Sequence, residues 1–315
     1  MLCALAGGVG GAKLAHGLSR ILPPEDLAIV VNIGDDFEHL GLHVSPDIDT
    51  VVYTLAGIAN PETGWGVAGE TWSFMDALGR LGAETWFRLG DRDLATHVER
   101  TRLLAEGAPL SAITARLARK LGVAPAIIPA SDDPVRTLVE TDEGELEFQH
   151  YFVRRQCAPR VSSLSYRNAE TARPAPLGGR PWTKMEMAGV IICPSNPYLS
   201  IAPILAMPEA RAWLENRRFP VAAVSPIVAG RALKGPAAKI MAELGTEPSA
   251  LAVARFYKGL VDFLIIDASD AALAGAVRAE GIEPVVMDTV MTNVADRERL
   301  AREVCALPAF SEARR

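Results

Sequence analysis

The sequence of 315 residues has few cysteines and no apolar run long enough to cross a membrane. Its four cysteines lie far apart and form no CxxC pair, so neither a zinc knot nor a disulfide framework is indicated, and a reducing compartment fits. The longest apolar runs have the length of strands, far below the ~20 residues of a membrane helix. The first residues lack the basic start and the apolar length of a signal peptide. We therefore expect a cytoplasmic protein with no membrane partner.

Basic residues are fewer than acidic residues, and they form no block. The 32 Lys and Arg residues against 38 Asp and Glu residues leave a formal net charge of −6, which argues against a nucleic-acid partner. Hydrophobic residues make up 49% of the chain, so a large core is expected and a disordered chain is excluded. The length fits one large domain or two smaller ones.

Strand and helix patterns alternate in both halves of the chain. An apolar run at 2–6 is followed by glycines and then by apolar residues at helical spacing, and residues 27–33 are apolar apart from Asn32. The same rhythm resumes at residue 188. The alternation predicts an α/β fold: a three-layer, Rossmann-like, mainly parallel sheet with helices on both faces. Ligands of such sheets bind beyond the carboxyl ends of the strands.

The middle of the chain has a different pattern. Residues 59–125 are dominated by helical spacing, which predicts a mostly helical insert subdomain within an α/β domain formed by residues 1–58 and 126–315. Alternating residues at 137–153 predict a β-hairpin, and the Pro-, Gly- and Arg-rich stretch at 168–182 predicts a surface loop.

A glycine-rich segment joins the first expected strand to the first expected helix. Backbone N–H groups at glycines can approach an anion closely, and the start of a helix favours negative charge. The segment matches neither a strict GxGxxG nor a P-loop. A tight strand–helix turn is the alternative, but four glycines exceed what a turn requires. We therefore predict phosphate or nucleotide binding by Gly8, Gly10, Gly11 and Lys13.

Two acidic pairs follow in the sequence. They are Asp35 with Asp36 and Asp47 with Asp49, and each pair lies at an expected strand end or helix start. Paired carboxylates beyond a sheet edge suit Mg²⁺, which takes one or two carboxylates together with water and phosphate oxygens. Helix capping is the alternative for one member of each pair. The pairs predict a metal site that uses at least one of these carboxylates.

A dense polar turn around Arg88 precedes a helix that carries His97. An arginine in such a turn can bind a phosphate or a polar substrate group through its planar fork. A solvated loop with internal ion pairs is the alternative. His97 is either a general base or a structural histidine, and the sequence alone leaves both open.

Polar residues also follow two expected strands in the second half. Hydroxyls, an amide and helix-start N–H groups at these points are suited to a nucleotide. No GxSxG elbow surrounds Ser195, so a serine hydrolase is not expected. The residues predicted to bind nucleotide here are Ser195, Asn196, Ser200, Ser225, Lys234 and Gly235.

Seven ordered motifs make the chain resemble the 2-phospho-L-lactate transferase family of coenzyme F-420 biosynthesis. The resemblance covers essentially the whole chain. The motifs are AGGVGGAKL (6–14), VNIGDD (31–36), SPDIDTVVYTL (45–55), RLGDRDLATH (88–97), PASDDP (129–134), CPSNPYLSIAPIL (193–205) and VSPIVAG…KGPAAK (224–239).

This resemblance implies a Mg²⁺-dependent transfer. The donor would be a three-carbon acid (2-phospholactate, phosphoenolpyruvate or phosphoglycerate) joined through a diphosphate to guanosine. The acceptor would be the ribityl hydroxyl of Fo, the deazaflavin precursor, and the products would be GMP and F-420-0 or its dehydro form. The resemblance also implies a homodimer. The two acidic pairs fit this reaction, since a metal held by Asp35 and Asp49 would stabilise charge around the reacting phosphorus, and we predict that both residues act in catalysis. Carried over by motif, Asp49 and Arg88 would contact Fo.

Two other functions are compatible with parts of the sequence. The first is that of a regulatory sugar-nucleotide-binding protein from a related, non-enzymatic family with a similar glycine loop, but such a protein would not need the intact PDIDT and GDRD motifs. A Rossmann-type dehydrogenase is disfavoured because the last glycine of its motif is missing and no isolated acid ends the second strand.

Overall fold

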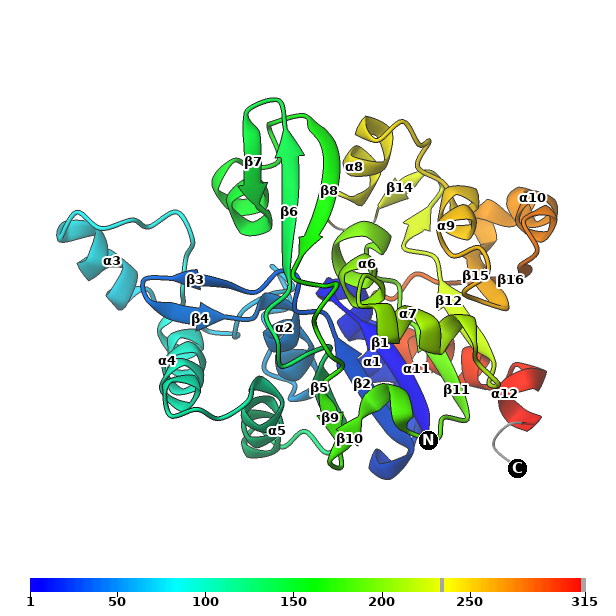
Figure 1. Ribbon diagram of the computed structural model, residues 1–315, viewed down its shortest axis with the longest axis horizontal. Coiled ribbons are helices and arrows are strands. Elements are labelled where there is room, and N and C mark those ends of the chain that lie inside the picture. The colour runs from blue at the N-terminus through cyan, green and yellow to red at the C-terminus, as the bar shows by residue number, and fades with distance from the viewer. Residues whose placement is uncertain (233–234, 313–315) are drawn as a thin grey trace.

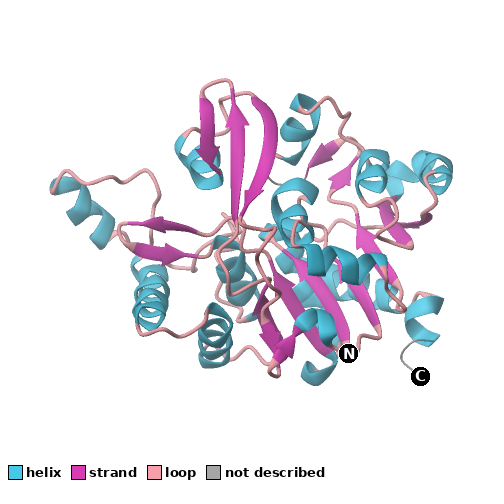
Figure 2. Ribbon diagram, in the orientation of Figure 1, coloured by secondary structure: helices cyan, strands magenta, loops and turns pink. Residues whose placement is uncertain are grey.

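A computed structural model of the chain describes residues 1–232 and 235–312 and centres on a seven-stranded sheet (Figures 1 and 2). Every neighbouring pair of its strands is parallel, which confirms the predicted α/β architecture. Lys234 lies outside the described residues. The strands, in spatial order, are β16 (Glu283–Met287), β15 (Phe263–Asp267), β12 (Val221–Val224), β11 (Gly189–Ile192), β1 (Leu2–Ala6), β2 (Leu27–Val31) and β5 (Ala126–Pro129).

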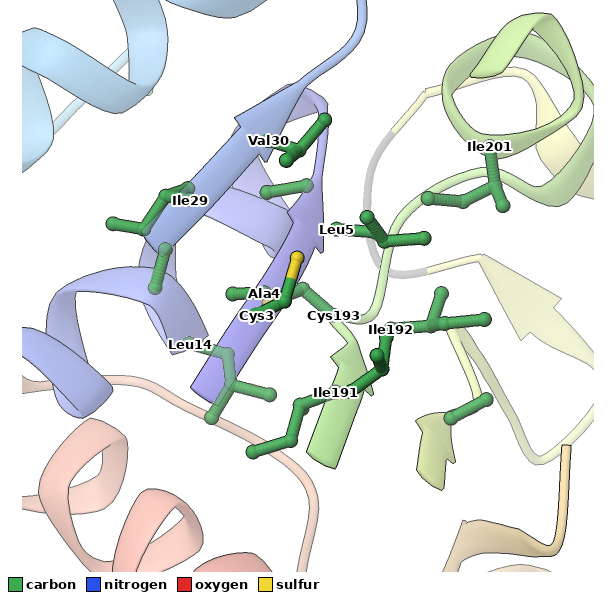
Figure 3. Close-up of a cluster of buried hydrophobic side chains, with 14 of the residues drawn as sticks. Cys3, Ala4, Leu5, Leu14, Ile29, Val30, Ile191, Ile192, Cys193 and Ile201 are labelled. Atoms are coloured by element: carbon green, nitrogen blue, oxygen red, sulfur yellow. The ribbon is translucent and has the colours of Figure 1, made fainter. Parts of the chain in front are cut away.

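Helices cover both faces of the sheet, which is why its central strands are apolar throughout. α1 (Gly8–Ile21) and α11 (Val294–Cys305) pack against each other on one face, and α7 (Pro208–Glu215) lies over the other (Figure 1). Figure 3 shows the core that this arrangement buries, where side chains of β1, β2 and β11 meet Leu14 of α1. The remaining helices of this half are α6 (Ala202–Leu205), α8 (Ala237–Glu243), α9 (Ala250–Phe256), α10 (Ala274–Ala279) and α12 (Pro308–Glu312).

The strand order reverses between β1 and β11. From β1 the chain adds β2 and β5 on one side, whereas β12, β15 and β16 extend from β11 on the other. The two strands pair in register, with Leu5 opposite Ile192. α1 begins directly after β1, and a π-helical segment, η4 (Pro197–Ile201), follows β11. The segments that leave the two strands therefore diverge, and the crevice between them is where ligands of such sheets bind.

The region between β2 and β5 contains the helices that the sequence predicts. After a short hairpin of β3 (Phe37–His39) and β4 (Leu42–Val44) come α2 (Pro46–Leu55), α3 (Ser73–Arg80), α4 (Asp91–Ala105) and α5 (Leu110–Lys120). Figure 1 shows α3 projecting from the body of the molecule. Ala118 of α5 belongs to the main core, so this end of the region packs on the central sheet. A separate subdomain at 59–125 stays a prediction.

A second sheet contains the predicted hairpin. β6 (Arg136–Thr141) and β7 (Gly144–Glu147) form it, and β8 (Val161–Arg167) pairs with the other edge of β6. This antiparallel sheet stands apart from the central one in Figure 1. The expected surface loop at 168–182 is wrong at its end, because Trp182 is fully buried and its indole N–H donates to the Ala130 carbonyl at 2.9 Å.

Short elements complete the described chain. They are η1 (Pro24–Asp26), η2 (His150–Arg154), β9 (Pro176–Leu177), β10 (Arg180–Pro181), η3 (Trp182–Lys184), β13 (Ile227–Val228), β14 (Arg231–Ala232) and η5 (Ala268–Leu273). Within residues 1–232 and 235–312, no helix combines the length and the apolar character that crossing a bilayer requires.

Candidate active site

A cavity of about 500 Å³ opens at the crevice between β1 and β11. Its walls come from the start of α1, from α2 and α4, and from the segments after β11 and β12. Gly11 is not part of the lining. The cavity brings together these predicted residues: Gly8, Gly10, Lys13, Asp35, Asp49, Arg88, Ser195, Asn196, Ser200, Ser225 and Gly235.

The glycines at the start of α1 permit close packing against the segment after β11. A Cβ at Gly10 would overlap the carbonyl oxygen of Pro194, and a Cβ at Gly11 would overlap the hydroxyl of Ser195. Gly8 has a φ of +66°, in the left-handed region that favours glycine. Much of this glycine content is therefore explained by packing of the chain on itself. Gly8 and Gly10 still line the cavity.

The protein supplies its own acceptors to the first amides of this segment. Gly7 N–H donates to Ser195 Oγ at 3.1 Å, and Gly8 N–H donates to Asp47 Oδ1 at 2.7 Å. The first N–H groups of a helix have no partner within the helix. Asp47 therefore caps α1 from a distant position, and the following residues of α1 border the cavity.

Two carboxylates are buried side by side at this end of the cavity. The side-chain amide of Asn32 donates to Asp35 Oδ1 at 3.1 Å and to Asp47 Oδ2 at 2.9 Å. Burial raises the pKa of Asp35 well above its ordinary value, and repulsion from Asp47 raises it further. Burial also raises the pKa of Asp47, to about 6, against the hydrogen bonds from Asn32 and Gly8. Two buried carboxylates that destabilise each other's charge suit a divalent cation, so this donor set fits Mg²⁺.

Asp49 lies in the same cavity but has different partners. Both of its oxygens accept hydrogen bonds from the guanidinium of Arg100, one of them at 3.0 Å. His97 Nδ1 lies 3.7 Å from Asp49 Oδ2. Asp49, Asp93 and His97 place potential ligand atoms within 4.8 Å of one another, but the guanidinium already provides positive charge there. That Asp35 and Asp49 share one Mg²⁺ stays a prediction.

Arg88 lies at the rim of the cavity. Its guanidinium stacks on the ring of Trp72, with 4.0 Å between its central carbon and the ring centroid. Stacking holds the plane of the guanidinium and leaves its N–H edges available to an acceptor. The geometry is compatible with the predicted role of Arg88 in binding a polar substrate group.

Asn196 and Ser225 use their side-chain oxygens in local turns. The Asn196 side-chain oxygen accepts from the amides of Tyr198, at 3.0 Å, and Leu199 and so caps η4. The Ser225 hydroxyl donates to the Ile227 carbonyl and accepts from the Ile227 N–H. Both residues line the cavity while shaping the backbone that follows. Their predicted role in nucleotide binding stays a prediction.

The sequence analysis missed four aromatic side chains that line the cavity. They are Trp65 and Phe87 from two loops, Phe148 from the segment after β7, and Phe152 from η2. Phe148 and Phe152 are four residues apart and their rings stack, whereas Trp65 and Phe87 lie far from them in the sequence. Arg100 was also missed. It lies two helical turns after Asp93, just beyond the noted motif at 88–97.

The fold and the site define a Rossmann-like α/β protein with its ligand cavity at the topological switch point. A family model described as "2-phospho-L-lactate transferase CofD" matches residues 2–306. The chain therefore belongs to the 2-phospho-L-lactate transferase family, and it is an enzyme of this type.

Relatives of known name match along nearly the whole chain. A phosphoenolpyruvate transferase of Streptomyces avermitilis is 41% identical over 310 residues, and a 2-phospho-L-lactate transferase of Methanopyrus kandleri is 41% identical over 307 residues. Each alignment covers 96% of this chain and 96% of the relative. The crystal structure of a UPF0052 family protein from Bacillus halodurans has a TM-score of 0.60 and 12% identity, covering 96% of this chain and 97% of that one. This last likeness concerns the fold alone.

Proposed function

We propose that the enzyme transfers a phosphorylated three-carbon acid from a guanosine-diphosphate-linked donor to the ribityl hydroxyl of Fo. The acid is 2-phospholactate, phosphoenolpyruvate or phosphoglycerate, and the products are GMP and F-420-0 or its dehydro form. The observation that carries the proposal is the mixed lining of one cavity, which includes buried carboxylates and the start of α1 as well as aromatic side chains. We propose that the carboxylates and the start of α1 form a polar end and that the aromatic side chains form an apolar end. A nucleotide diphosphate suits the first and a flat ring system suits the second.

The polar end is proposed to hold the donor. Lys13 brings positive charge to the lining, and its ammonium also donates to the Met291 carbonyl at 2.7 Å. Gly8 and Gly10 place the start of α1 beside it, where the helix dipole favours phosphate oxygens. We propose that Ser195, Asn196, Ser200, Ser225 and Gly235 contact the rest of the guanosine diphosphate portion.

Mg²⁺ is the proposed cofactor of this end. Bound there, it would neutralise charge on the phosphate oxygens around the reacting phosphorus. Asp35 and Asp49 are its predicted ligands, and Asp47 is a further buried carboxylate of the same cavity. The raised pKa of Asp35 and of Asp47 supports this proposal, because a divalent cation would relieve the repulsion between them.

The apolar end is proposed to hold Fo with its ribityl chain directed to the polar end. Arg88 and Asp49 would contact Fo, and Phe87 lies next to Arg88 in the lining. The hydroxyl oxygen forms a new bond to the phosphorus that carries the three-carbon acid. The bond from that phosphorus to the GMP oxygen breaks, and the hydroxyl proton is released. The residues of this chain contribute by positioning the two substrates, which is the main requirement of phosphoryl transfer.

A single incubation tests the proposal. Purified protein, Fo and Mg²⁺ are mixed with each of three synthetic guanylylated acids, and mass spectrometry is used to look for the phosphodiester product and GMP. We expect product with at least one donor and none after chelation of Mg²⁺. Binding of a nucleotide with no product from any donor would favour the regulatory sugar-nucleotide-binding alternative. We also propose a cytoplasmic homodimer, and light scattering of the purified protein measures its oligomeric state.

A further inference from the structure

One face of α4 carries three polar side chains that are buried against α2. Asp93, His97 and Arg100 follow one another by one turn of helix, so they point the same way. The Arg100 side chain is 1% exposed, and it does not line the cavity. On α2, Asp49 and Tyr53 are also one turn apart and face this row. Polar contacts between the two rows connect the helices beside the cavity.

The guanidinium of Arg100 engages two side chains that line the cavity. It binds both oxygens of Asp49, and its Nη1 lies 3.4 Å from His97 Nδ1. A planar guanidinium matches a carboxylate through two parallel hydrogen bonds, so the orientation of Asp49 is set by Arg100. The pKa of Arg100 is raised because the Asp49 carboxylate outweighs the effect of burial, which acts in the opposite direction.

We infer the tautomer of His97 from the same contact. A guanidinium has only donors, so a hydrogen bond from Arg100 needs Nδ1 of His97 as an acceptor without a proton. The ring proton is then on Nε2, which lies 3.3 Å from Asp93 Oδ1. Tyr53 donates its hydroxyl to the same Asp93 oxygen at 2.7 Å. One buried arginine thereby sets the carboxylate of Asp49 and the ring of His97.

We propose that Arg100 is a positioning residue of the transfer reaction, which acts on the acceptor through Asp49 and His97 without touching substrate. The inference rests on the proposed function, since Asp49 is proposed there to contact Fo. Lysine in place of arginine would keep the charge but lose the two-pronged contact. Arg100→Lys is therefore the informative change, because the buried charge of Asp49 keeps a partner while its orientation is released.

The kinetic test compares Arg100→Lys with Arg102→Lys on the same helix. Arg102 is exposed and pairs with Glu99 and Glu106, so it is a matched control. We expect Arg100→Lys to lower kcat/KM for Fo at least tenfold while the donor KM changes less than twofold, and Arg102→Lys to change neither by more than twofold. A kcat/KM for Fo in Arg100→Lys within threefold of the wild-type value would overturn the inference. A donor KM that rises by as large a factor as kcat/KM for Fo falls would also overturn the inference, because a merely structural role affects both substrates.

A spectroscopic readout separates this inference from the proposed function. Long-range ¹H–¹⁵N correlation spectra of the wild-type protein report the tautomer of each histidine ring, and His97→Gln identifies the signals of His97. We expect the pattern of a ring protonated on Nε2 alone. A proton on Nδ1 would overturn the inference even if transfer is observed. If no donor gives product, the proposed function fails, and the ring spectrum still shows whether Nδ1 of His97 is free to accept a hydrogen bond from Arg100.

Discussion

At the scale of single residues, Asp49 combines a cavity position with a buried ion pair. We expect Asp49→Asn to reduce transfer at least ~100-fold, because the amide removes the charge and one of the two acceptors that Arg100 binds. Stability should fall by ~1–3 kcal/mol, since the buried guanidinium keeps only part of its partner. Turnover assays and denaturant melts measure the two effects. Asp288→Asn, at an exposed pair with Arg299, is the control, and unchanged turnover in Asp49→Asn would contradict its assigned role.

A substitution of Arg88, also a single residue, tests whether this side chain binds Fo or the nucleotide. We expect Arg88→Ala to weaken Fo binding by ~1–2 kcal/mol and to leave nucleotide binding nearly unchanged, since its stacked guanidinium lies at the rim of the cavity. Calorimetric titration with Fo and with GDP measures both affinities. Arg80→Ala, at an exposed position of α3, controls for the loss of surface charge. Equal weakening of both ligands would reject the assignment of Arg88 to the acceptor.

At the scale of elements, the contact between α1 and α11 depends on a glycine. A Cβ at Gly17 would overlap the carbonyl of Arg297 and lie within 2.6 Å of its carbon atom. Because backbone atoms cannot move aside cheaply, we expect Gly17→Ala to destabilise the fold by ~2–3 kcal/mol. Gly275→Ala on α10 is the matched control, since nothing lies within 4 Å of the added carbon, and it should be neutral or stabilising by up to ~1 kcal/mol. Equal melting temperatures for the two variants would contradict this packing.

The end of β15 is joined to its surroundings by Asp267. This carboxylate accepts from Ser269 and from the amide and hydroxyl of Thr289, a residue that lines the cavity. Burial alone would raise its pKa, but these hydrogen bonds outweigh it and lower the pKa to about 2. A depressed pKa stabilises the fold at pH values above the unfolded pKa, and the contribution is lost as the pH falls toward the folded one.

The corresponding variant is Asp267→Asn. We expect it to be ~1–2 kcal/mol less stable than wild type at neutral pH, with the difference shrinking as the pH falls from ~4 toward ~2. Urea melts across this range provide the measurement. Asp270 in the following turn accepts a hydrogen bond from Ala229 N–H. Asp270→Asn is the comparison variant, because it removes a different carboxylate nearby. A difference for Asp267→Asn that stays constant over the whole pH range would show that the charge of Asp267 is not what stabilises this turn.

At the scale of the whole molecule, the central sheet was predictable and much of the site was not. Apolar runs such as 2–6 and 27–31 have a local signature because both faces of a parallel strand are buried. β8 has no such signature, because its pairing with β6 is decided by contacts between distant segments. The same holds for the pairing of Asp49 with Arg100 on another helix. Local periodicity places elements, whereas the partners of polar side chains depend on how the elements pack.

The buried carboxylates of the cavity connect the proposed binding of Mg²⁺ to the stability of the whole molecule. Asp35 and Asp47 are both buried, and repulsion from Asp47 adds to the burial that raises the pKa of Asp35, so their joint ionisation opposes folding at neutral pH. Mg²⁺ should therefore raise the melting temperature by mass action, by ~2–4 °C for each kcal/mol of stabilisation.

Asp35→Asn should melt higher than wild type without Mg²⁺ and gain less from its addition, because the repulsion is already removed while a ligand is lost. Thermal melts with and without Mg²⁺ at matched ionic strength measure both shifts, with Asp288→Asn as the exposed control. An equal Mg²⁺ shift in Asp35→Asn and wild type would remove Asp35 from the metal site, and a lower melting temperature without Mg²⁺ would show that its hydrogen bond from Asn32 outweighs the repulsion.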